Sequence, residues 1–166
     1  MTKRLLLLLL LWPLMAIAQD NRLYTTQHGL ATSNINSLTL DSHGLLWVAS
    51  NAQLAFFDGA GFHYLPNINT ATGQPYYTLV NRIYEDKDNH YWLLTNFGLY
   101  YYDALLNHHE RILVDLNENE QHGYSITQLI DLPGNPREKI VVTSGYGLYY
   151  LNCETNKINT AKSEAL

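Results

Sequence analysis

The feature that most constrains the fold is a repeat, first seen between Asp41 and Gly59. It opens with the turn Asp41-Ser42-His43-Gly44, where the aspartate can bond the turn backbone and the glycine allows positive φ. Leu45–Ser50 follows as an apolar run between turn residues, which is typical of a strand buried on both faces. Gln53–Phe57 is predicted to be the next strand. The stretch therefore predicts a short antiparallel hairpin.

The same construction returns twice along the chain. In the second copy, Glu85–Asn89 replaces the turn, and Tyr91–Thr95 and Gly98–Asp103 replace the two strands. In a weaker third copy, the turn is predicted at Asp131–Glu138, with strands at Lys139–Thr143 and Gly147–Asn152. The positions that recur in the copies are Gly44, Trp47, Leu54, Asp58, Trp92, Gly98, Leu99, Asp103, Gly147 and Leu148.

The spacing of the copies predicts the fold class. Trp47 and Trp92 are 45 residues apart, and turn residues recur between them. Such a period is typical of four-stranded antiparallel units, the blades of a β-propeller. We expect an all-β chain of about three blades, an incomplete propeller. Two faces of such an array have no neighbouring blade to pack on.

The repeat also predicts domain boundaries. Residues 34–74 are expected to form blade 1, residues 75–123 blade 2 and residues 124–166 a partial blade 3, after a leading strand and link at residues 19–33. The strand-like leading piece, Arg22–Thr26, completes the last blade of a ring, pairs locally or frays. First strands are expected at Ile35–Leu40, Leu79–Tyr84 and Ser125–Ile130, and outer strands at Phe62–Leu65, Glu110–Val114 and Lys157–Thr160.

Residues 1–18 have the order of a secretory signal peptide. Lys3-Arg4 is followed by the apolar run Leu5–Leu11 and by the small-residue cleavage site Ala16-Ile17-Ala18. An uncleaved membrane anchor is the alternative, but the apolar stretch is shorter than the roughly 20 residues a span needs, and Pro13 interrupts it. We therefore expect export to the periplasm and no membrane span in the mature chain.

Composition narrows the classes of partner. The chain has 10 basic and 15 acidic residues, which argues against nucleic acid as the main partner. Its single cysteine, Cys153, excludes an intrachain disulfide.

Several segments together resemble the two-component regulator propeller repeat. They are Gly29-Leu30, Asn34–Leu38, Asp41–Trp47, Leu54 and Asp58-Gly59, with Phe62 after them. Arg82–Asp103 is a second match, and Ile130–Leu151 is a partial third. The departures are Gln53 and Ala55 in the first copy, and Ile140 near the place of tryptophan in the third.

The resemblance implies a function. The family builds the periplasmic sensor regions of bacterial hybrid two-component histidine kinases, which detect carbohydrates released from polysaccharides. Its members carry two seven-bladed propellers, a β-sandwich, a transmembrane helix and a kinase. The kinase is absent from this chain, so the resemblance implies either the amino-terminal piece of a sensor or a shortened gene product. It implies signal transduction without enzyme activity, and the expected partners are an oligosaccharide and the remaining propeller blades or another receptor chain.

The remaining motifs predict no metal site, no cofactor and no catalytic residue. Asp86–Asn89 resembles the start of a calcium loop, but Phe97 stands where the loop needs glutamate. His108-His109-Glu110 lies on an expected strand, where neighbours point to opposite faces. Thr143-Ser144-Gly145 is not an esterase motif. Two alternatives stay open: a part of a secreted propeller enzyme acting on polysaccharide, or a truncated product without independent function.

Ligands of propellers usually bind on loops at one end of the channel. The loops between the second and third strands carry Asn51, Asn96, Phe97 and Tyr146 at equivalent places in the three repeats. Aromatic and amide side chains there can stack on sugars and hydrogen-bond to them. These four residues are therefore the predicted ligand-binding candidates.

Overall fold

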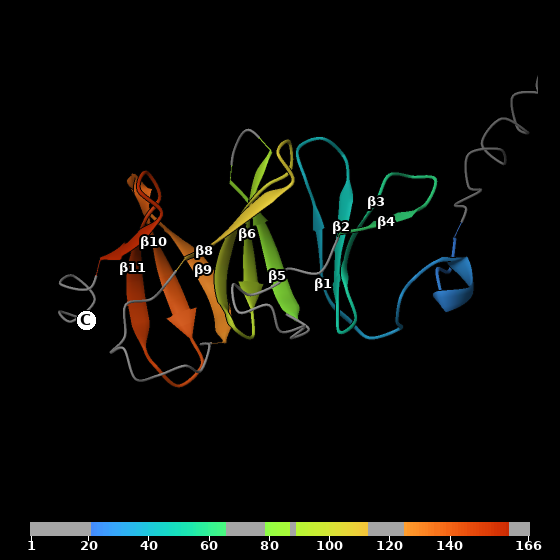
Figure 1. Cartoon of the computed structure of the whole chain (residues 1–166), viewed down its shortest axis with the longest axis horizontal. Helices are drawn as coiled ribbons and strands as arrows, with labels where there is room; N and C mark the ends of the chain where they lie inside the picture. The colour runs from blue at the N-terminus through green and yellow to red at the C-terminus, as the bar shows by residue number, and fades with distance from the viewer. Residues whose placement is uncertain (1–20, 66–78, 87–88, 113–124, 160–166) are drawn as a thin grey trace, which may run out of the picture.

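The computed structural model describes residues 21–65, 79–86, 89–112 and 125–159, and they form three four-stranded antiparallel sheets (Figure 1). Each sheet takes its strands in chain order, and we call the sheets blades 1, 2 and 3. Blade 1 contains β1(Ile35–Leu40), β2(Leu46–Ser50), β3(Leu54–Phe57) and β4(Phe62–Tyr64). Blade 2 contains β5(Val80–Glu85), β6(His90–Thr95), β7(Gly98–Asp103) and β8(His108–Ile112). Blade 3 contains β9(Ile126–Leu132), β10(Asn135–Thr143), β11(Leu148–Asn152) and β12(Lys157–Asn159).

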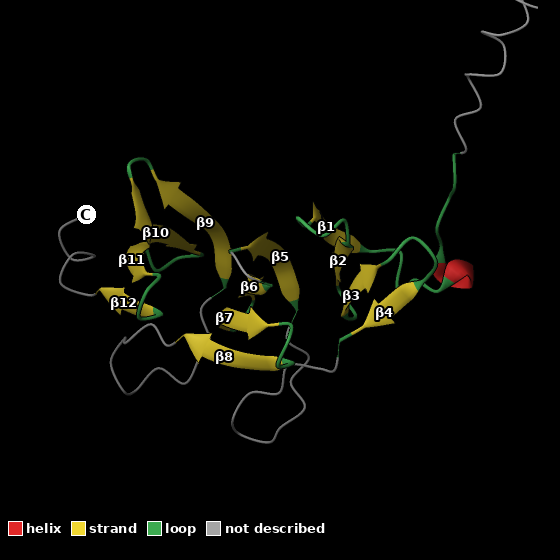
Figure 2. Ribbon diagram, turned by 90° about the horizontal axis from the view of Figure 1, so that it is seen from above, coloured by secondary structure: helices red, strands yellow, loops and turns green. Residues whose placement is uncertain are grey.

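The three blades stand side by side as an open array. Seen from above, the first strands β1, β5 and β9 follow one edge, and the outer strands β4, β8 and β12 lie toward the opposite edge (Figure 2). β1 packs beside β5, and β5 and β6 pack beside β9. The prediction of an all-β, incomplete propeller is confirmed.

The core lies between the blades and forms two apolar clusters, one in each interface. β6 explains this division, because its successive side chains point to opposite faces of the sheet. Tyr91 and Leu93 face blade 1, whereas Trp92 and Leu94 face blade 3, and all four are buried. The continuous apolar run in the sequence is therefore a strand with a neighbour on each side.

Polar side chains join the first strands of blades 1 and 2. Asn36 Nδ2 donates to the Val80 carbonyl at 3.1 Å, and Thr39 Oγ1 donates to the Ile83 carbonyl at 3.1 Å. Both bonds run from β1 to the backbone of β5. They place β1 against β5 in one register.

Of the alternatives for Arg22–Thr26, local strand pairing does not occur. Residues 21–25 form no strand, and a 3₁₀ helix occupies Thr26–His28, with Gly29 in the left-handed region at φ 97°. The ring of Tyr24 packs edge-on against Phe57 and Phe62 instead. A strand needs a partner edge, and this segment meets a sheet face, where aromatic packing takes the place of strand pairing.

The third repeat also differs from its prediction. β9 runs to Leu132 and β10 begins at Asn135, so the turn is much shorter than Asp131–Glu138. The pairing of β10 with β9 is irregular between Asn135 and Lys139. A bulge of this kind accommodates Pro136, which has no backbone N–H to donate.

The outer strands lie close to their predicted places. β8 begins at His108, two residues before the predicted Glu110, and Leu113 and Val114 lie outside the described residues. Thr160, the predicted end of the last outer strand, and the predicted signal peptide are also outside them. No helix in the described part of the chain has the length and apolar character to cross a membrane.

Candidate functional site

The turns between the second and third strands of the blades lie together at one end of the array, the lower end in Figure 1. Each of these turns is tied to the start of the first strand of its own blade. The backbone N–H groups of Asn51 and Asn96 donate to the carbonyls of Asn34 and Leu79, each at 3.2 Å. In blade 3, Ser144 N donates to the Ser125 carbonyl at 2.8 Å. Three equivalent turns are thereby held in equivalent positions.

A hydroxyl at the end of each second strand closes the turn. Ser50 Oγ donates to the Gln53 carbonyl at 2.7 Å. Thr95 Oγ1 donates to the Gly98 carbonyl at 2.7 Å and accepts the Phe97 N–H at 3.1 Å. Thr143 Oγ1 repeats the bond to the Gly147 carbonyl at 2.9 Å. The recurring Ser or Thr of the repeat therefore shapes the turns.

The structure places all four predicted ligand-binding residues on these turns. Asn51 and Tyr146 are exposed, whereas Asn96 and Phe97 are half-buried. Asn96 Oδ1 accepts the Leu79 N–H at 2.9 Å, so this oxygen already serves the turn. The Tyr146 carbonyl accepts a hydrogen bond from Tyr149 Oη at 2.9 Å. Two aromatic rings and two amides thus lie at one end of the array, and their role with a ligand remains a prediction.

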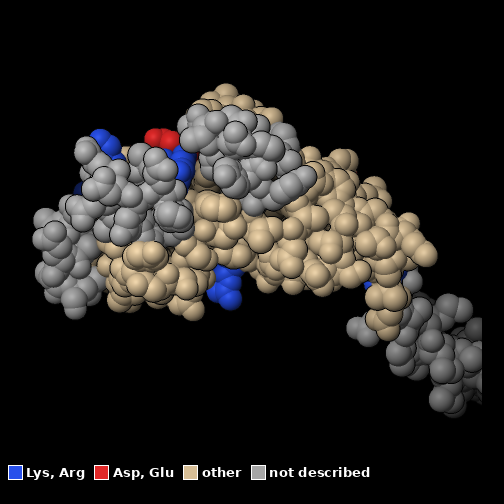
Figure 3. Space-filling view, turned by 60° about the horizontal axis from the view of Figure 1, so that its bottom comes forward, with Lys and Arg blue, Asp and Glu red and all other residues tan. Residues whose placement is uncertain are grey.

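The surface around this end carries little charge. In the view that brings the lower end forward, most described atoms belong to uncharged residues, with isolated basic and acidic groups between them (Figure 3). An uncharged, aromatic and amide surface suits a neutral, hydroxyl-rich ligand better than an anion.

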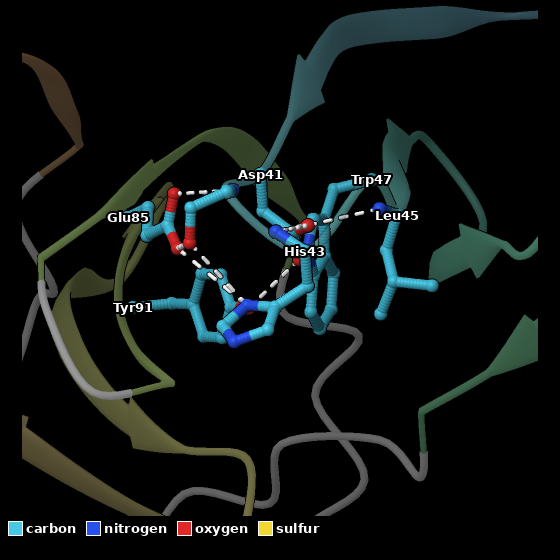
Figure 4. Close-up of polar contacts among 7 residues, drawn as sticks. Asp41, His43, Leu45, Trp47, Glu85 and Tyr91 are labelled. Atoms are coloured by element: carbon cyan, nitrogen blue, oxygen red, sulfur yellow. Dashed lines mark hydrogen bonds and ion pairs between the residues drawn. The ribbon is translucent and has the colours of Figure 1, made fainter.

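At the opposite end, Asp41 lies at the centre of a polar network that joins blades 1 and 2 (Figure 4). Asp41 Oδ1 accepts the backbone N–H groups of His43 and Leu45, each at 2.9 Å. Asp41 Oδ2 accepts Trp47 Nε1–H and Tyr91 Oη–H, each at 2.8 Å. Tyr91 belongs to β6, so this carboxylate reaches the next blade.

Glu85, at the end of β5, forms a second link between the same two blades. Its carboxylate accepts the Ser42 N–H at 2.8 Å and also the Ser42 hydroxyl. The sequence predicted only the turn role of Asp41. The partner from blade 2 could not be identified, because Tyr91 follows Asp41 by 50 residues and nothing local marks the pair.

The network determines the ionisation of its members. Burial alone would raise the pKa of Asp41, but hydrogen bonds from Trp47, Leu45, Tyr91 and His43 together lower it below the usual 3.8. Burial, together with the hydrogen bond to Asp41, raises the pKa of Tyr91. Asp41 is therefore an ionised hydrogen-bond acceptor at neutral pH, and Tyr91 is a neutral donor.

The network is not repeated between blades 2 and 3. Trp92 is equivalent to Trp47, yet among the described residues its buried Nε1 has no hydrogen-bond partner. Tyr101 Oη donates to Asp86 Oδ2 at 3.4 Å, and burial with the nearby Asp86 charge raises the pKa of Tyr101 to about 12. In blade 3, the residue equivalent to Tyr91 is Lys139, and its ammonium group pairs with the Asp131 carboxylate.

An Asp or Asn at the end of each third strand caps the following turn. Asp58 Oδ1 accepts the N–H groups of Ala60 and Gly61 at 2.8 and 2.9 Å. These two bonds, with one from His63, lower the pKa of Asp58 to about 2. Asp103 and Asn152 accept the same pair of N–H groups in blades 2 and 3. This position therefore has a structural role in all three blades.

Within the described ranges, no three histidine, cysteine or acidic side chains gather as metal ligands would. His108, His109 and Glu110 lie on the outer strand β8, as predicted. Lys87 and Asp88, the middle of the calcium-like stretch, lie outside the described residues.

Comparison with known proteins connects this architecture to a family. Residues 29–52 match the family model described as two component regulator propeller. This segment contains the first strand, the Asp41 turn and the second strand of blade 1. No curated protein matches the chain at a significant level. The predicted resemblance is thus confirmed over residues 29–52.

Solved structures show the same fold. One is the extracellular domain assigned to the hybrid two component system BT3049 of B. thetaiotaomicron, with a TM-score of 0.68 and 23% identity. Another is that of BT4673 from the same organism, with a TM-score of 0.66 and 22% identity. The matches cover 88% and 85% of this chain but only 21% and 18% of those chains. The chain therefore spans about a fifth of the structures it resembles.

Proposed function

We propose that this chain, which carries a two-component regulator propeller repeat at residues 29–52, is a ligand-recognition segment of a two-component signal-transduction receptor. The observation that carries the proposal is the three-blade array, whose fold matches the extracellular domains of hybrid two-component systems. The array supplies rigid turns at one end, on which recognition residues can be varied without changing the core.

The proposed ligand is an oligosaccharide, bound at the end that carries Asn51, Asn96, Phe97 and Tyr146. A sugar presents a face of C–H groups that stacks on aromatic rings and hydroxyls that pair with amides. Phe97 and Tyr146 belong to adjacent blades, at equivalent turns. The proposed location is the periplasm, supported by the signal-peptide pattern of residues 1–18.

Binding of a panel of neutral oligosaccharides to the full chain, measured by isothermal titration calorimetry, tests this role. We expect Phe97→Ala and Tyr146→Ala each to weaken binding about tenfold, because stacking of a ring contributes on the order of 1–2 kcal/mol. His43→Ala is the matched control, since it removes an exposed ring at the opposite end of the array.

Two results would overturn the proposal. Affinity that survives both aromatic substitutions would exclude this end of the array as the binding surface. Absence of binding to every neutral oligosaccharide in the panel would exclude the proposed ligand class.

A further inference from the structure

The contact between blades 2 and 3 contains a buried hydrogen-bond donor that lacks an acceptor. Trp92 is 0% exposed, and among the described residues its Nε1–H has no partner. Trp47, at the equivalent position of blade 1, donates to Asp41 Oδ2 at 2.8 Å (Figure 4). A buried N–H without an acceptor destabilises the folded chain, so an acceptor within reach of Trp92 would be stabilising.

Blade 2 carries a carboxylate at the position equivalent to Asp41, and its backbone lies in the same way. Asp86 N donates to the His90 carbonyl at 2.8 Å, as Asp41 N donates to the Leu45 carbonyl at 3.0 Å. Both aspartates therefore leave the end of a first strand with the same backbone hydrogen bond.

The two indole rings are also oriented alike. Trp92 lies opposite Tyr101 across β6 and β7, with an angle of 55° between the ring planes. Trp47 lies opposite Phe56 across β2 and β3, with an angle of 56°. A change of the Asp86 side-chain rotamer would therefore be enough to bring its carboxylate to Trp92 Nε1.

The Tyr101 hydroxyl holds the Asp86 carboxylate away from Trp92. Tyr101 Oη donates to Asp86 Oδ2 at 3.4 Å, which is long for a hydrogen bond. In blade 1, the equivalent Phe56 has no hydroxyl that could compete for Asp41.

Lys139 attracts the same carboxylate toward blade 3. It lies on the face of β10 that carries Val141, which is buried against blade 2. The Lys139 side chain is only 15% exposed, whereas the side chain of its partner Asp131 is 83% exposed. A mostly buried ammonium group whose counter-ion lies in water is stabilised by a second carboxylate.

We propose that Asp86 alternates between two positions and acts as a conformational switch in the contact between blades 2 and 3. In the first position it accepts the Tyr101 hydroxyl within blade 2. In the second it accepts Trp92 Nε1–H and pairs with Lys139, so that it joins blade 2 to blade 3 as Asp41 joins blade 1 to blade 2. The switch does not depend on the ligand-binding role.

Heteronuclear NMR spectra of the indole N–H groups of the full chain test the switch, because a hydrogen bond to a carboxylate moves the N–H proton signal downfield. Tyr101→Phe should move the Trp92 signal downfield, since it removes the competing hydroxyl, and Asp86→Ala should move it upfield. The parent signal should lie between these two positions. Lys139→Met should move it toward the Asp86→Ala position, because the ammonium group that attracts the carboxylate is gone.

Tyr102→Phe is the matched control, since it removes a hydroxyl of the same strand that bonds Asn107 instead. It should leave the Trp92 signal in place. The Trp47 signal in each spectrum shows whether the variant keeps its fold, and if one variant loses that signal, the other two decide the question. A parent signal that coincides with that of Asp86→Ala or of Tyr101→Phe would overturn the proposal, because the carboxylate would then hold a single position. A Trp92 signal that Lys139→Met leaves unmoved would also overturn it.

Discussion

At the scale of single residues, the repeat combines turn formation with the attachment of one blade to the next. Asp41 does both, since two of its hydrogen bonds close its own turn and a third comes from Tyr91 of blade 2. The burial of Trp47 and Trp92 was predicted from their position in apolar strands, and the structure confirms it. The hydrogen bond between the blades was not predicted. The packing of the blades alone determines that Tyr91 is the residue of the next repeat that reaches the Asp41 carboxylate.

Asp41→Asn should destabilise the chain at pH 7 by about 1–3 kcal/mol. An asparagine can keep the two turn bonds through its oxygen, but its amide N–H groups would then face Trp47 Nε1–H and Tyr91 Oη–H. Trp47 Nε1 can only donate, so it would lose its acceptor, and the Tyr91 hydroxyl would have to turn round to accept from the amide. Urea denaturation measures the effect, and a variant as stable as the parent would show that the network contributes nothing.

The same carboxylate gives the chain an acid-sensitive step. The pKa of Asp41 is lower in the folded chain than the usual 3.8, so its contribution is complete above that pH and is lost as the pH falls through the folded value. Urea midpoints of the parent and of Asp41→Asn should therefore converge as the pH falls below 3.8. A difference that stays constant across this range would contradict the assignment.

Thr95→Val tests the hydroxyl that closes the turn of blade 2. Valine keeps the volume of this fully buried side chain but leaves the Gly98 carbonyl and the Phe97 N–H without their bonds. We expect a loss of about 1–3 kcal/mol in the free energy of unfolding. Thr127→Val, which removes an exposed hydroxyl on β9, should change it by less than about 0.5 kcal/mol. Equal effects at the two positions would contradict this turn role.

At the scale of elements, the second strand of each blade carries the packing, and β6 does so on both faces. The alternation of Tyr91 and Leu93 with Trp92 and Leu94 divides the core into two interfaces. The sequence predicted this strand because apolar runs and turn residues are local signals. The sequence did not predict the start of β10, where a bulge decides the conformation, and it left Arg22–Thr26 open, because the conformation there depends on a partner edge.

Leu93→Ala and Leu94→Ala should each destabilise the chain by about 2–5 kcal/mol, since both side chains are fully buried. The two substitutions weaken different interfaces, the first toward blade 1 and the second toward blade 3. Leu106→Ala, on an exposed turn of the same blade, is the control and should have an effect below about 0.5 kcal/mol. An effect of either core substitution as small as that of the control would contradict an interface core.

At the scale of the whole molecule, stability depends on neighbours. In a repeat array it is roughly the sum of blade terms and interface terms, so a blade with two neighbours is held more firmly than a blade with one. Among the described residues, blade 2 packs on another blade at both faces, whereas blades 1 and 3 each pack on one other blade. The candidate ligand residues are spread over all three blades, so the recognition surface exists only when the array is intact.

Amide hydrogen exchange, followed by mass spectrometry along the full chain, tests the array most directly. We expect β6 to exchange most slowly, because its opening requires both interfaces to break. The outer strands β4 and β12 should exchange fastest among the strands. Exchange of β6 as fast as that of β4 and β12 would contradict the claim that blade-to-blade packing holds this protein together.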